Sequence, residues 1–333
     1  MCIIVGAAMS YMYWGLGLAL NPLIAVFFAR AAEKKGLRID FPFLLSTTVA
    51  SGSVWQYGFS ASAPLLMNTP GHFLEEITGI MPLSTTIFAP ATGVFVVGFL
   101  VLVFVTARLL LPSRPRFISR FASACNLADD ARAARNEAEP AADPRLSGTF
   151  SQRLEASAGL QLNALNTTLL FLCLVFHRTI WNFSKVLPAA VVTAWPVIVL
   201  YHLYAGVAGV IQYTTVGEEF VSMFAAYSTP LTFPLLTALA GTLMAVFVPS
   251  SGGQWVIQGF ITAKTAQTIG VSAQRGLLAL GVGDHMGNLI SPFWAVIEGG
   301  IARIDYRQYI GYNLVFAAIW FTYGVLCFTF LPA

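Results

Sequence analysis

The amino-acid sequence predicts an all-α polytopic membrane protein with two inverted repeats, each containing a re-entrant hairpin and a broken helix. Three observations lead to this fold class. Hydrophobic residues make up 57% of the chain and charged residues only 10%, against about 25% charged residues in soluble domains. Several apolar segments are long enough to cross a bilayer core of about 30 Å. Some of these segments are interrupted by glycine, serine and proline, which a plain spanning helix in lipid disfavours.

The first repeat is expected to span residues 1–111. It opens with an apolar segment, residues 1–29, that is interrupted at Tyr13–Gly17 and again at Asn21-Pro22. Glycine and proline weaken or end a helix, so this segment predicts a helical hairpin. It has no charged leading region and is too long for a signal sequence, so no cleavable signal peptide is expected.

Two further apolar segments complete the first repeat. Residues 41–67 are interrupted around Gly52 and again at Gly58–Pro64, which predicts a broken helix. Residues 84–111 have no break and predict a transmembrane helix. The only charge in this helix, Arg108, lies near its end, where a long side chain can reach the membrane surface.

A hydrophilic segment, residues 112–160, separates the repeats and is rich in arginine and alanine. Its size and composition predict a partly helical or disordered cytoplasmic loop. The second repeat, residues 161–331, begins with apolar segments that extend to Tyr213. Its later elements are expected to be a re-entrant hairpin at 231–262, a broken helix at 276–301 and a last helix at 309–331.

Lysine and arginine determine the expected orientation, because cytoplasmic loops carry an excess of these residues. The loops at 30–40 and 112–160 are rich in them and are expected in the cytoplasm. The loops at 68–82 and 214–230 contain none and are expected outside. Simple alternation would place the arginine-containing loop at 302–308 outside. A hairpin that enters the membrane and turns back at its tip returns this loop to the cytoplasm, although it leaves Lys264 and Arg275 outside.

The two halves of the chain share an order of segments but differ in orientation. Each half has an interrupted segment, marked by Gly15 in the first and by Gly252-Gly253 in the second, and a broken helix follows it. The first broken helix is expected to run from inside to outside and the second from outside to inside. Paired broken segments of opposite orientation indicate a substrate site near the middle of the membrane.

The most unusual stretch is Val248–Trp255, which lies inside an otherwise apolar segment. Its proline, serines and glycines leave backbone groups that lipid cannot satisfy, so the stretch is expected to line a cavity. Helix N-termini at such breaks present free N–H groups and the positive end of the helix dipole. With the serine hydroxyls, these groups suit a small carboxylate. The alternative is that the glycines only allow tight helix packing.

Substrate-binding residues are therefore expected from both interrupted regions. In the second hairpin they are Ser250, Ser251, Gly252, Gly253, Gln254 and Trp255. In the first repeat they are Trp14, Gly15, Ser60 and Ser62. The alternative for the tryptophans is the aromatic belt at the membrane surface.

Asp284 is the most informative charged residue, because a carboxylate within an apolar segment is costly and usually functional. It predicts an ion-coupling site together with Asn288 and Ser291. Two coupling ions stay open. The carboxylate holds a cation such as Na⁺ with Asn288 and backbone carbonyls, or it carries a proton with His285. The alternative without a transport role is a cap at a half-helix N-terminus. No cofactor and no metal centre are predicted.

Other classes of function have little support in the sequence. No basic face with interleaved aromatic residues indicates nucleic-acid binding. The four cysteines form no Cys-x-x-Cys pair. No serine–lysine, zinc-protease or nucleophile-elbow motif indicates an enzyme. The expected partners are a small carboxylate and the lipid bilayer.

Several motifs, in their order along the chain, resemble the signature of the bacterial short-chain fatty acid transporter family. They are Trp14–Leu18, Gly58–Leu66 with Thr69–His72, Phe247–Gly259, Gly283–Asn288 with Pro292–Ala295, and Ile310–Tyr312. The likeness covers nearly the whole chain, and motifs of this length in this order are specific.

The resemblance implies an ion-transporter-superfamily fold and an elevator-type mechanism. It implies that the protein carries acetoacetate, butyrate and similar monocarboxylates and is coupled to an ion gradient. It also implies a multi-pass protein of the bacterial cytoplasmic (inner) membrane and, by analogy with the fold class, a homodimer. Two alternatives stay open: a carrier of dicarboxylates or aminobenzoyl-glutamate-like substrates, and a non-transporting remnant subunit. A dicarboxylate carrier would need two positive side chains at the site, and the breaks carry none.

The chain departs from the family pattern in four places. It is expected to lack the first N-terminal helices and one internal helix between Arg153 and Asn163. Tyr13 stands where the family usually has asparagine before Trp-Gly, which removes a polar ligand from the first hairpin. The tip Ser250–Gly253 stands where the family usually has a tip richer in glycine.

Overall fold

The computed structural model is all-helical over the residues that it describes, so the predicted all-α membrane fold is confirmed. The described residues are 1–127, 170–177, 179–185, 187–188, 202–203, 206, 209–210 and 213–332. Most of the predicted loop at 112–160 and most of the predicted apolar segments before Tyr213 lie outside these residues.

The N-terminal part contains a hairpin, a broken helix and a straight helix. The hairpin is α1 (Cys2–Met12) and α2 (Trp14–Lys34), and the broken helix is α3 (Phe41–Gly52), η1 (Ser53–Tyr57) and α4 (Ser62–Met67). The elements that follow are α5 (Glu75–Thr78), η2 (Leu83–Thr85), α6 (Pro90–Leu109) and η3 (Ile118–Arg120).

The C-terminal part contains the same three kinds of element after a first helix, α11 (Thr215–Tyr227). The hairpin is α12 (Phe233–Ala245) and α13 (Ser251–Thr268), and the broken helix is α14 (Ala273–Ile290) and α15 (Pro292–Ala302). The elements that follow are η4 (Tyr306–Gln308) and the straight helix α16 (Ile310–Phe330).

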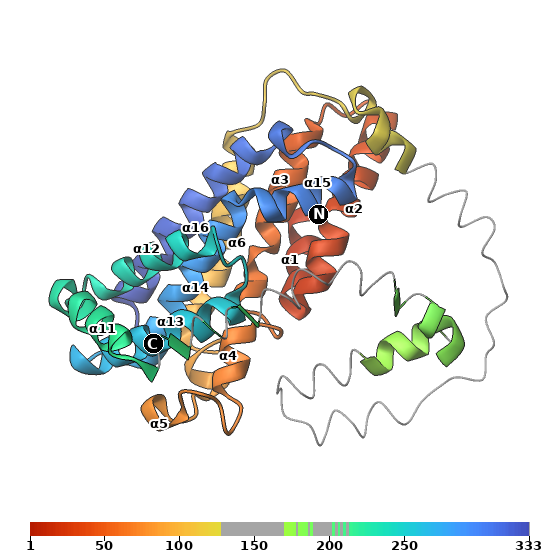
Figure 1. Ribbon diagram of the computed structural model, residues 1–333. Helices are drawn as coiled ribbons and strands as arrows, with labels where there is room; N and C mark the ends of the chain where they lie inside the picture. The colour runs from red at the N-terminus through yellow and green to blue at the C-terminus, as the bar shows by residue number, and fades with distance from the viewer. Residues whose placement is uncertain are drawn as a thin grey trace.

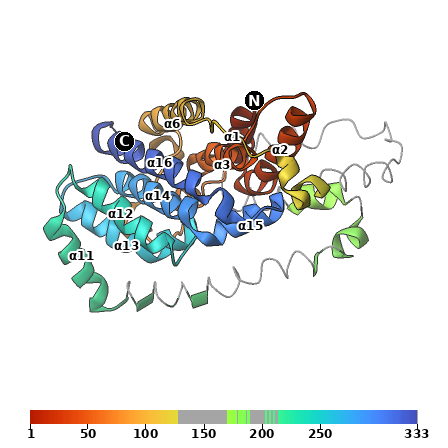
Figure 2. The same ribbon diagram turned by 90° about the horizontal axis from the view of Figure 1, so that it is seen from above.

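The two parts pack against each other through the straight helices and the broken helices. In Figure 1 and Figure 2, α1–α3 lie on one side of the molecule and α11–α13 on the other, with α14 and α16 between them. Helix α16 contacts α3 and α6 of the first part and α12 and α14 of the second. The core therefore runs across both parts and is rich in aromatic side chains. Its largest fully buried members include Tyr57, Phe95, Phe99, Trp320 and Phe328.

Local signals in the sequence explain where several helices begin. The Asp40 carboxylate accepts from the Phe43 N–H at 2.9 Å and caps α3, and Ser272 caps α14 in the same way. Such caps satisfy N–H groups that lack a partner within the helix. Proline in the first turn, where its missing N–H costs nothing, marks four helix starts: Pro42, Pro90, Pro234 and Pro292.

Apolar side chains on the outside of α6 suit a helix in a membrane. Its buried face repeats every four residues, at Ala91, Phe95, Phe99 and Val103. Its outer face carries Val94, Val97, Val101, Phe104 and Val105, which are 42–64% exposed. A continuous apolar outer face is incompatible with water but suits a bilayer. Among the described residues, α2, α6 and α16 are each long and apolar enough to cross a membrane.

The arginine-containing loops meet at one end of the helices. The Arg116 Nε donates to Asp40 Oδ2 at 3.2 Å, and its Nη1 donates to Gln308 Oε1 at 3.1 Å. The Ser119 hydroxyl donates to Glu33 Oε1 at 2.6 Å. The loops that follow α2, α6 and α15 therefore lie together, as the charge bias predicts.

The opposite end holds the loop at 68–82 and the turn between α13 and α14. There the Gln267 Nε2 donates to the Ile77 carbonyl oxygen at 2.7 Å, and Arg275 reaches the Leu331 carbonyl oxygen of the chain end at 3.5 Å. The α12–α13 hairpin thus has its open end here and its tip in the middle of the molecule. The α1–α2 hairpin opens toward the arginine-containing end, so the two hairpins are inverted.

Glycines allow α12 and α14 to pack with their backbones in contact. A Cβ atom on Gly283 would overlap the carbonyl oxygen of Ala238, and one on Gly287 would overlap the side chain of Ala245. Small residues at a helix interface permit this close approach in membranes. The tight packing holds α14, which carries Asp284, against the second hairpin.

Two sequence predictions about local structure are wrong. The predicted interruption at Asn21-Pro22 is absent, because α2 continues through Pro22. Membrane helices tolerate proline where neighbouring groups compensate the lost hydrogen bond. The predicted loop at 214–230 contains α11, whose apolar side chains at Val216, Phe220 and Phe224 follow helical spacing.

We expect Gly283→Ala to lower the melting temperature of the purified protein in detergent. The added methyl meets a backbone carbonyl that cannot rotate away, and such overpacking costs about 1–3 kcal/mol. This cost exceeds the gain of up to about 1 kcal/mol that alanine brings to a helix interior. Melting curves followed by circular dichroism measure the change. The matched control is Gly300→Ala in α15, where nothing lies within 4 Å of the added atom. Equal melting temperatures would contradict the close packing of α12 on α14.

Candidate substrate and ion site

The two hairpin tips and the two helix breaks meet in the middle of the molecule. The first tip touches the first break, because the Trp14 N–H donates to Ser60 Oγ at 2.8 Å. The second tip touches the first broken helix, because Gln56 Nε2 donates to Ser251 Oγ at 3.0 Å. The first tip also touches the second broken helix, because the Trp14 and Trp294 rings pack edge to face with their centroids 6.4 Å apart. The four interrupted segments therefore form one site.

The second tip presents a helix N-terminus to this site. The chain leaves α12 at Ala245 and re-enters a helix at Ser251. The Ser250 hydroxyl accepts from the Gly253 N–H at 3.3 Å and caps α13. The N–H groups of Ser251 and Gly252 lie in the first turn and have no acceptor within the helix. The tip thus combines free N–H groups, a hydroxyl and the positive end of the helix dipole.

Other predicted residues of this tip face the protein interior. Gln254 is fully buried, and its Nε2 donates to the Gly241 carbonyl oxygen at 2.7 Å and to Gln258 Oε1 at 2.7 Å. It therefore ties α13 to α12. Trp255 is fully buried and packs with an apolar cluster that includes Met67. Gly253 is buried in the first turn of α13.

The first tip is narrower and more aromatic than the second. A single extended residue, Tyr13, separates α1 from α2. The Ser60 hydroxyl is used by the Trp14 N–H, which leaves the Gly15 N–H as a free group in the first turn of α2. Ser62 begins α4, and a Cβ atom on Gly252 would lie 3.1 Å from its hydroxyl. The first break thus lies directly against the second tip.

Three tryptophans gather beside the first tip. The Trp14 ring lies 6.4 Å from the Trp55 ring of η1 and 6.4 Å from the Trp294 ring of α15. Trp14 is 38% exposed, so the cluster has an open face. Clustered aromatic rings offer an apolar surface for a short alkyl chain. Of the three, Trp14 is among the predicted substrate-binding residues, while Trp55 and Trp294 fit the interpretation that tryptophans beside the breaks line the site rather than form an aromatic belt.

Two of the three predicted ion-coupling residues, Asp284 and Asn288, are joined by a hydrogen bond. The Asn288 Nδ2 donates to Asp284 Oδ2 at 3.1 Å, and the Trp294 Nε1 donates to Asn288 Oδ1 at 3.2 Å. Asp284 is thereby linked to the tryptophan cluster. It lies inside α14 and caps no helix, so the capping interpretation is wrong. Ser291 lies at the break, where its hydroxyl accepts from the Phe293 N–H at 3.3 Å and caps α15.

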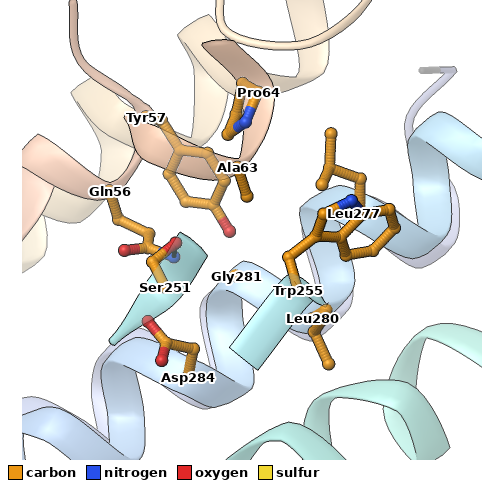
Figure 3. A pocket seen from close by; sticks show the side chains of 10 residues that line it. All are labelled: Gln56, Tyr57, Ala63, Pro64, Ser251, Trp255, Leu277, Leu280, Gly281 and Asp284. Atoms are coloured by element: carbon orange, nitrogen blue, oxygen red, sulfur yellow. Dashed lines mark hydrogen bonds between the residues drawn. The ribbon is translucent and has the colours of Figure 1, made fainter. Parts of the chain in front are cut away.

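A small cavity lies between the second tip, η1 and α14 (Figure 3). Its volume is about 10 Å³, which is about the space of one water molecule. Figure 3 shows Gln56, Ser251 and Asp284 on one side with their polar atoms toward one another, and Trp255 and Leu277 on the other. Gln56 was not predicted from the sequence, since an amide beside a break carries no motif of its own.

The site can bind an anion without a basic side chain. Neither lysine nor arginine lines the cavity, and the described residues contain no group of three or more histidine, cysteine or acidic side chains that could hold a metal ion. Positive potential at the tips comes from helix N-termini. N–H and hydroxyl donors at the second tip therefore take the place that basic side chains have in other anion sites.

Comparison with known proteins gives consistent matches. The sequence model of one family, short chain fatty acid transporter, matches residues 1–158 and 147–331. A protein of Escherichia coli K12 named "Putative short-chain fatty acid transporter" is 26% identical over 97% of this chain and 76% of its own length. A protein of the same name from Haemophilus influenzae is 26% identical over 96% of this chain and 76% of its own length. No solved structure matches the chain significantly.

We expect Gln254→Leu to destabilise the second hairpin. The substitution keeps the side-chain volume but removes the hydrogen bond that joins α13 to the Gly241 carbonyl oxygen of α12 and leaves Gln258 Oε1 without its donor, and the loss of a buried hydrogen bond costs about 0.5–1.5 kcal/mol. The melting temperature in detergent should fall clearly. The matched control is Gln267→Leu in the same helix. That side chain makes an exposed hydrogen bond, so its loss should change stability by less than about 0.5 kcal/mol. A larger effect for the control would contradict the role of Gln254 between α12 and α13.

Proposed function

Because the chain belongs to the short-chain fatty acid transporter family, we propose that it is a secondary carrier of small monocarboxylates such as acetoacetate and butyrate. The membrane fold and the family both support a membrane transporter. The single observation that supports this substrate class is the convergence of two helix N-termini and three tryptophans at one site. The proposal assigns the carboxylate to the second tip and the alkyl chain to the tryptophans.

The absence of basic side chains at the site favours one carboxylate over two. A second carboxylate would bring another negative charge into a buried region, where an unpaired charge is costly. The described residues that line the central cavity carry only one ionisable carboxyl, Asp284, and no cationic group. The site therefore suits a substrate with one acidic group and a short apolar part.

The proposed location is the cytoplasmic membrane of a bacterium, with the arginine-containing end inside. Its support is the meeting of the loops after α2, α6 and α15 at one end, combined with the positive-inside rule. Coupling to an ion gradient is part of the proposal, and its support is the buried carboxylate of Asp284 beside the substrate site. The two inverted hairpins suit a carrier that exposes its site to each side in turn.

We expect the purified protein in liposomes to exchange labelled butyrate for unlabelled butyrate. Neutral butyric acid crosses lipid by itself, so the useful signal is faster entry of label when unlabelled butyrate is loaded inside, with protein-free liposomes measured in parallel. Gly252→Leu should abolish this acceleration, because its side chain would fill the space between the second tip and Ser62.

The matched control for this experiment is Gly311→Leu, which adds the same side chain in α16 where nothing lies within 4 Å of the Cβ position. Its exchange rate should equal that of the unmodified protein. Absence of protein-dependent exchange of butyrate and acetoacetate by the unmodified protein would overturn the proposed function.

A further inference from the structure

Two buried oxygen atoms that face the central cavity have no hydrogen-bond donor. They are Asp284 Oδ1 and Gln56 Oε1. Asp284 is 1% exposed and Gln56 is 2% exposed, and both side chains line the same small cavity. Buried polar atoms are nearly always paired, so an unpaired set calls for an explanation. Both oxygens belong to side chains that line one cavity, and a single proton shared between them would give each a partner.

The surroundings favour a proton over a metal cation in this position. A hard cation is held by several oxygen ligands at once, often carbonyls of unwound backbone. Asp284 instead lies inside the continuous helix α14. Nearby carbonyl oxygens of this helix already accept from side chains: Leu278 from Tyr57, Val282 from Trp320 and Gly283 from Thr242. A single shared proton joins two oxygen atoms, and two oxygen atoms are unpaired here.

A water molecule in the cavity is a less complete explanation. It would supply donors to the two oxygens, and it could accept from the unpaired Trp255 Nε1. It would leave the negative charge of Asp284 without compensation, because no lysine or arginine lines the cavity. An isolated carboxylate in a low-dielectric interior is far more costly than a neutral carboxylic acid.

We propose that Asp284 is the proton-binding residue of this carrier and that Gln56 transmits its protonation state to the substrate site. The proposal rests on the carrier function proposed above. In the protonated state, the Asp284 Oδ1–H donates to Gln56 Oε1. The Gln56 Nε2 then donates to Ser251 Oγ, as the structure has it at 3.0 Å. The Ser251 hydroxyl hydrogen is left free to donate to a substrate carboxylate at the second tip.

Loss of the proton reverses this chain of hydrogen bonds. An ionised Asp284 accepts only, so the Gln56 amide turns over and directs its Nε2 to the carboxylate. The Gln56 Oε1 then accepts from the Ser251 hydroxyl, whose hydrogen is no longer available to the substrate. A glutamine amide can adopt both orientations because its oxygen and nitrogen ends have nearly the same shape. Proton and carboxylate are therefore bound together, which is the requirement for symport.

Among the titratable side chains near the cavity, Asp284 is the one that we expect to control binding by gaining and losing a proton. Helix α12 contributes no titratable side chain, and Lys264 of α13 lies about 20 Å along the helix from Ser251. Tyr57 of η1 donates its hydroxyl to the Leu278 carbonyl oxygen. His285 of α14 packs between the rings of Trp55 and Trp320, at 5.6 and 4.8 Å. Its ring makes no hydrogen bond, so it has no route to the substrate.

The test is the dissociation constant of butyrate at several pH values, measured by tryptophan fluorescence of the purified protein in detergent without sodium. Between about pH 6 and pH 9 butyrate is fully ionised, so a pH effect belongs to the protein. We expect the dissociation constant to rise by up to about tenfold per pH unit above the titration of Asp284. The sign follows from the proposal, since binding needs the protonated form, which is lost as pH rises.

Two variants distinguish this mechanism from a structural role. Asp284→Asn imitates the protonated acid, with its oxygen toward Asn288 Nδ2 and its nitrogen toward Gln56 Oε1. It should bind butyrate tightly at every pH, and its initial rate of butyrate uptake under a pH gradient should fall to that of protein-free liposomes. Gln56→Leu should bind butyrate without pH dependence, because no amide oxygen then takes the Ser251 hydroxyl hydrogen from the substrate when Asp284 is ionised.

The control variants are Glu298→Gln, which removes the other carboxylate of the second broken helix, and His285→Gln. Both should keep the pH dependence of the unmodified protein. A dissociation constant that does not change with pH, one that falls on addition of sodium, or a pH dependence lost in His285→Gln but kept in Asp284→Asn would overturn the proposal. Absence of any carboxylate binding by the unmodified protein would instead overturn the carrier function itself.

Discussion

Backbone polar groups need partners where no water is present, and this constraint shapes the whole structure. A helix that stops inside an apolar protein exposes N–H and carbonyl groups that lipid cannot satisfy. Four such interruptions occur in the part of the chain that the structure describes, and they lie near one another. There each supplies what another lacks, as when Ser60 accepts from the Trp14 N–H and Ser251 accepts from Gln56. The same convergence that stabilises the breaks gathers the residues of the candidate site.

The two halves of the site are related in topology but differ in chemistry. The first tip contributes aromatic surface through Trp14 and a single extended residue, Tyr13. The second tip contributes a longer break, a serine cap and free N–H groups around Ser251. The inverted pair of hairpins therefore supplies an apolar surface at one tip and polar groups at the other. A molecule with one charged end and one short alkyl end matches this division.

Much of this arrangement can be predicted from local signals, and the rest depends on contacts between distant segments. Glycine, serine and proline act within a few residues, so the breaks near Tyr13, at Ser60 and at Ser291 follow from the sequence. Partners depend on packing, and nothing near Gln56 indicates that it faces a carboxylate more than 200 residues away. The helix at Thr215–Tyr227 was missed because its two acidic residues suggested a loop and obscured its helical spacing.

The contacts of Arg116 have a mechanical consequence. One guanidinium joins the start of α3, through Asp40, to the start of α16, through Gln308 and the Tyr312 hydroxyl. Farther along the same two helices, Ser46 bonds to a buried asparagine of α16. Sliding α3 along α16 would break all of these bonds at once, although the two helices come from opposite halves of the chain. These hydrogen bonds therefore oppose any movement of α3 relative to α16.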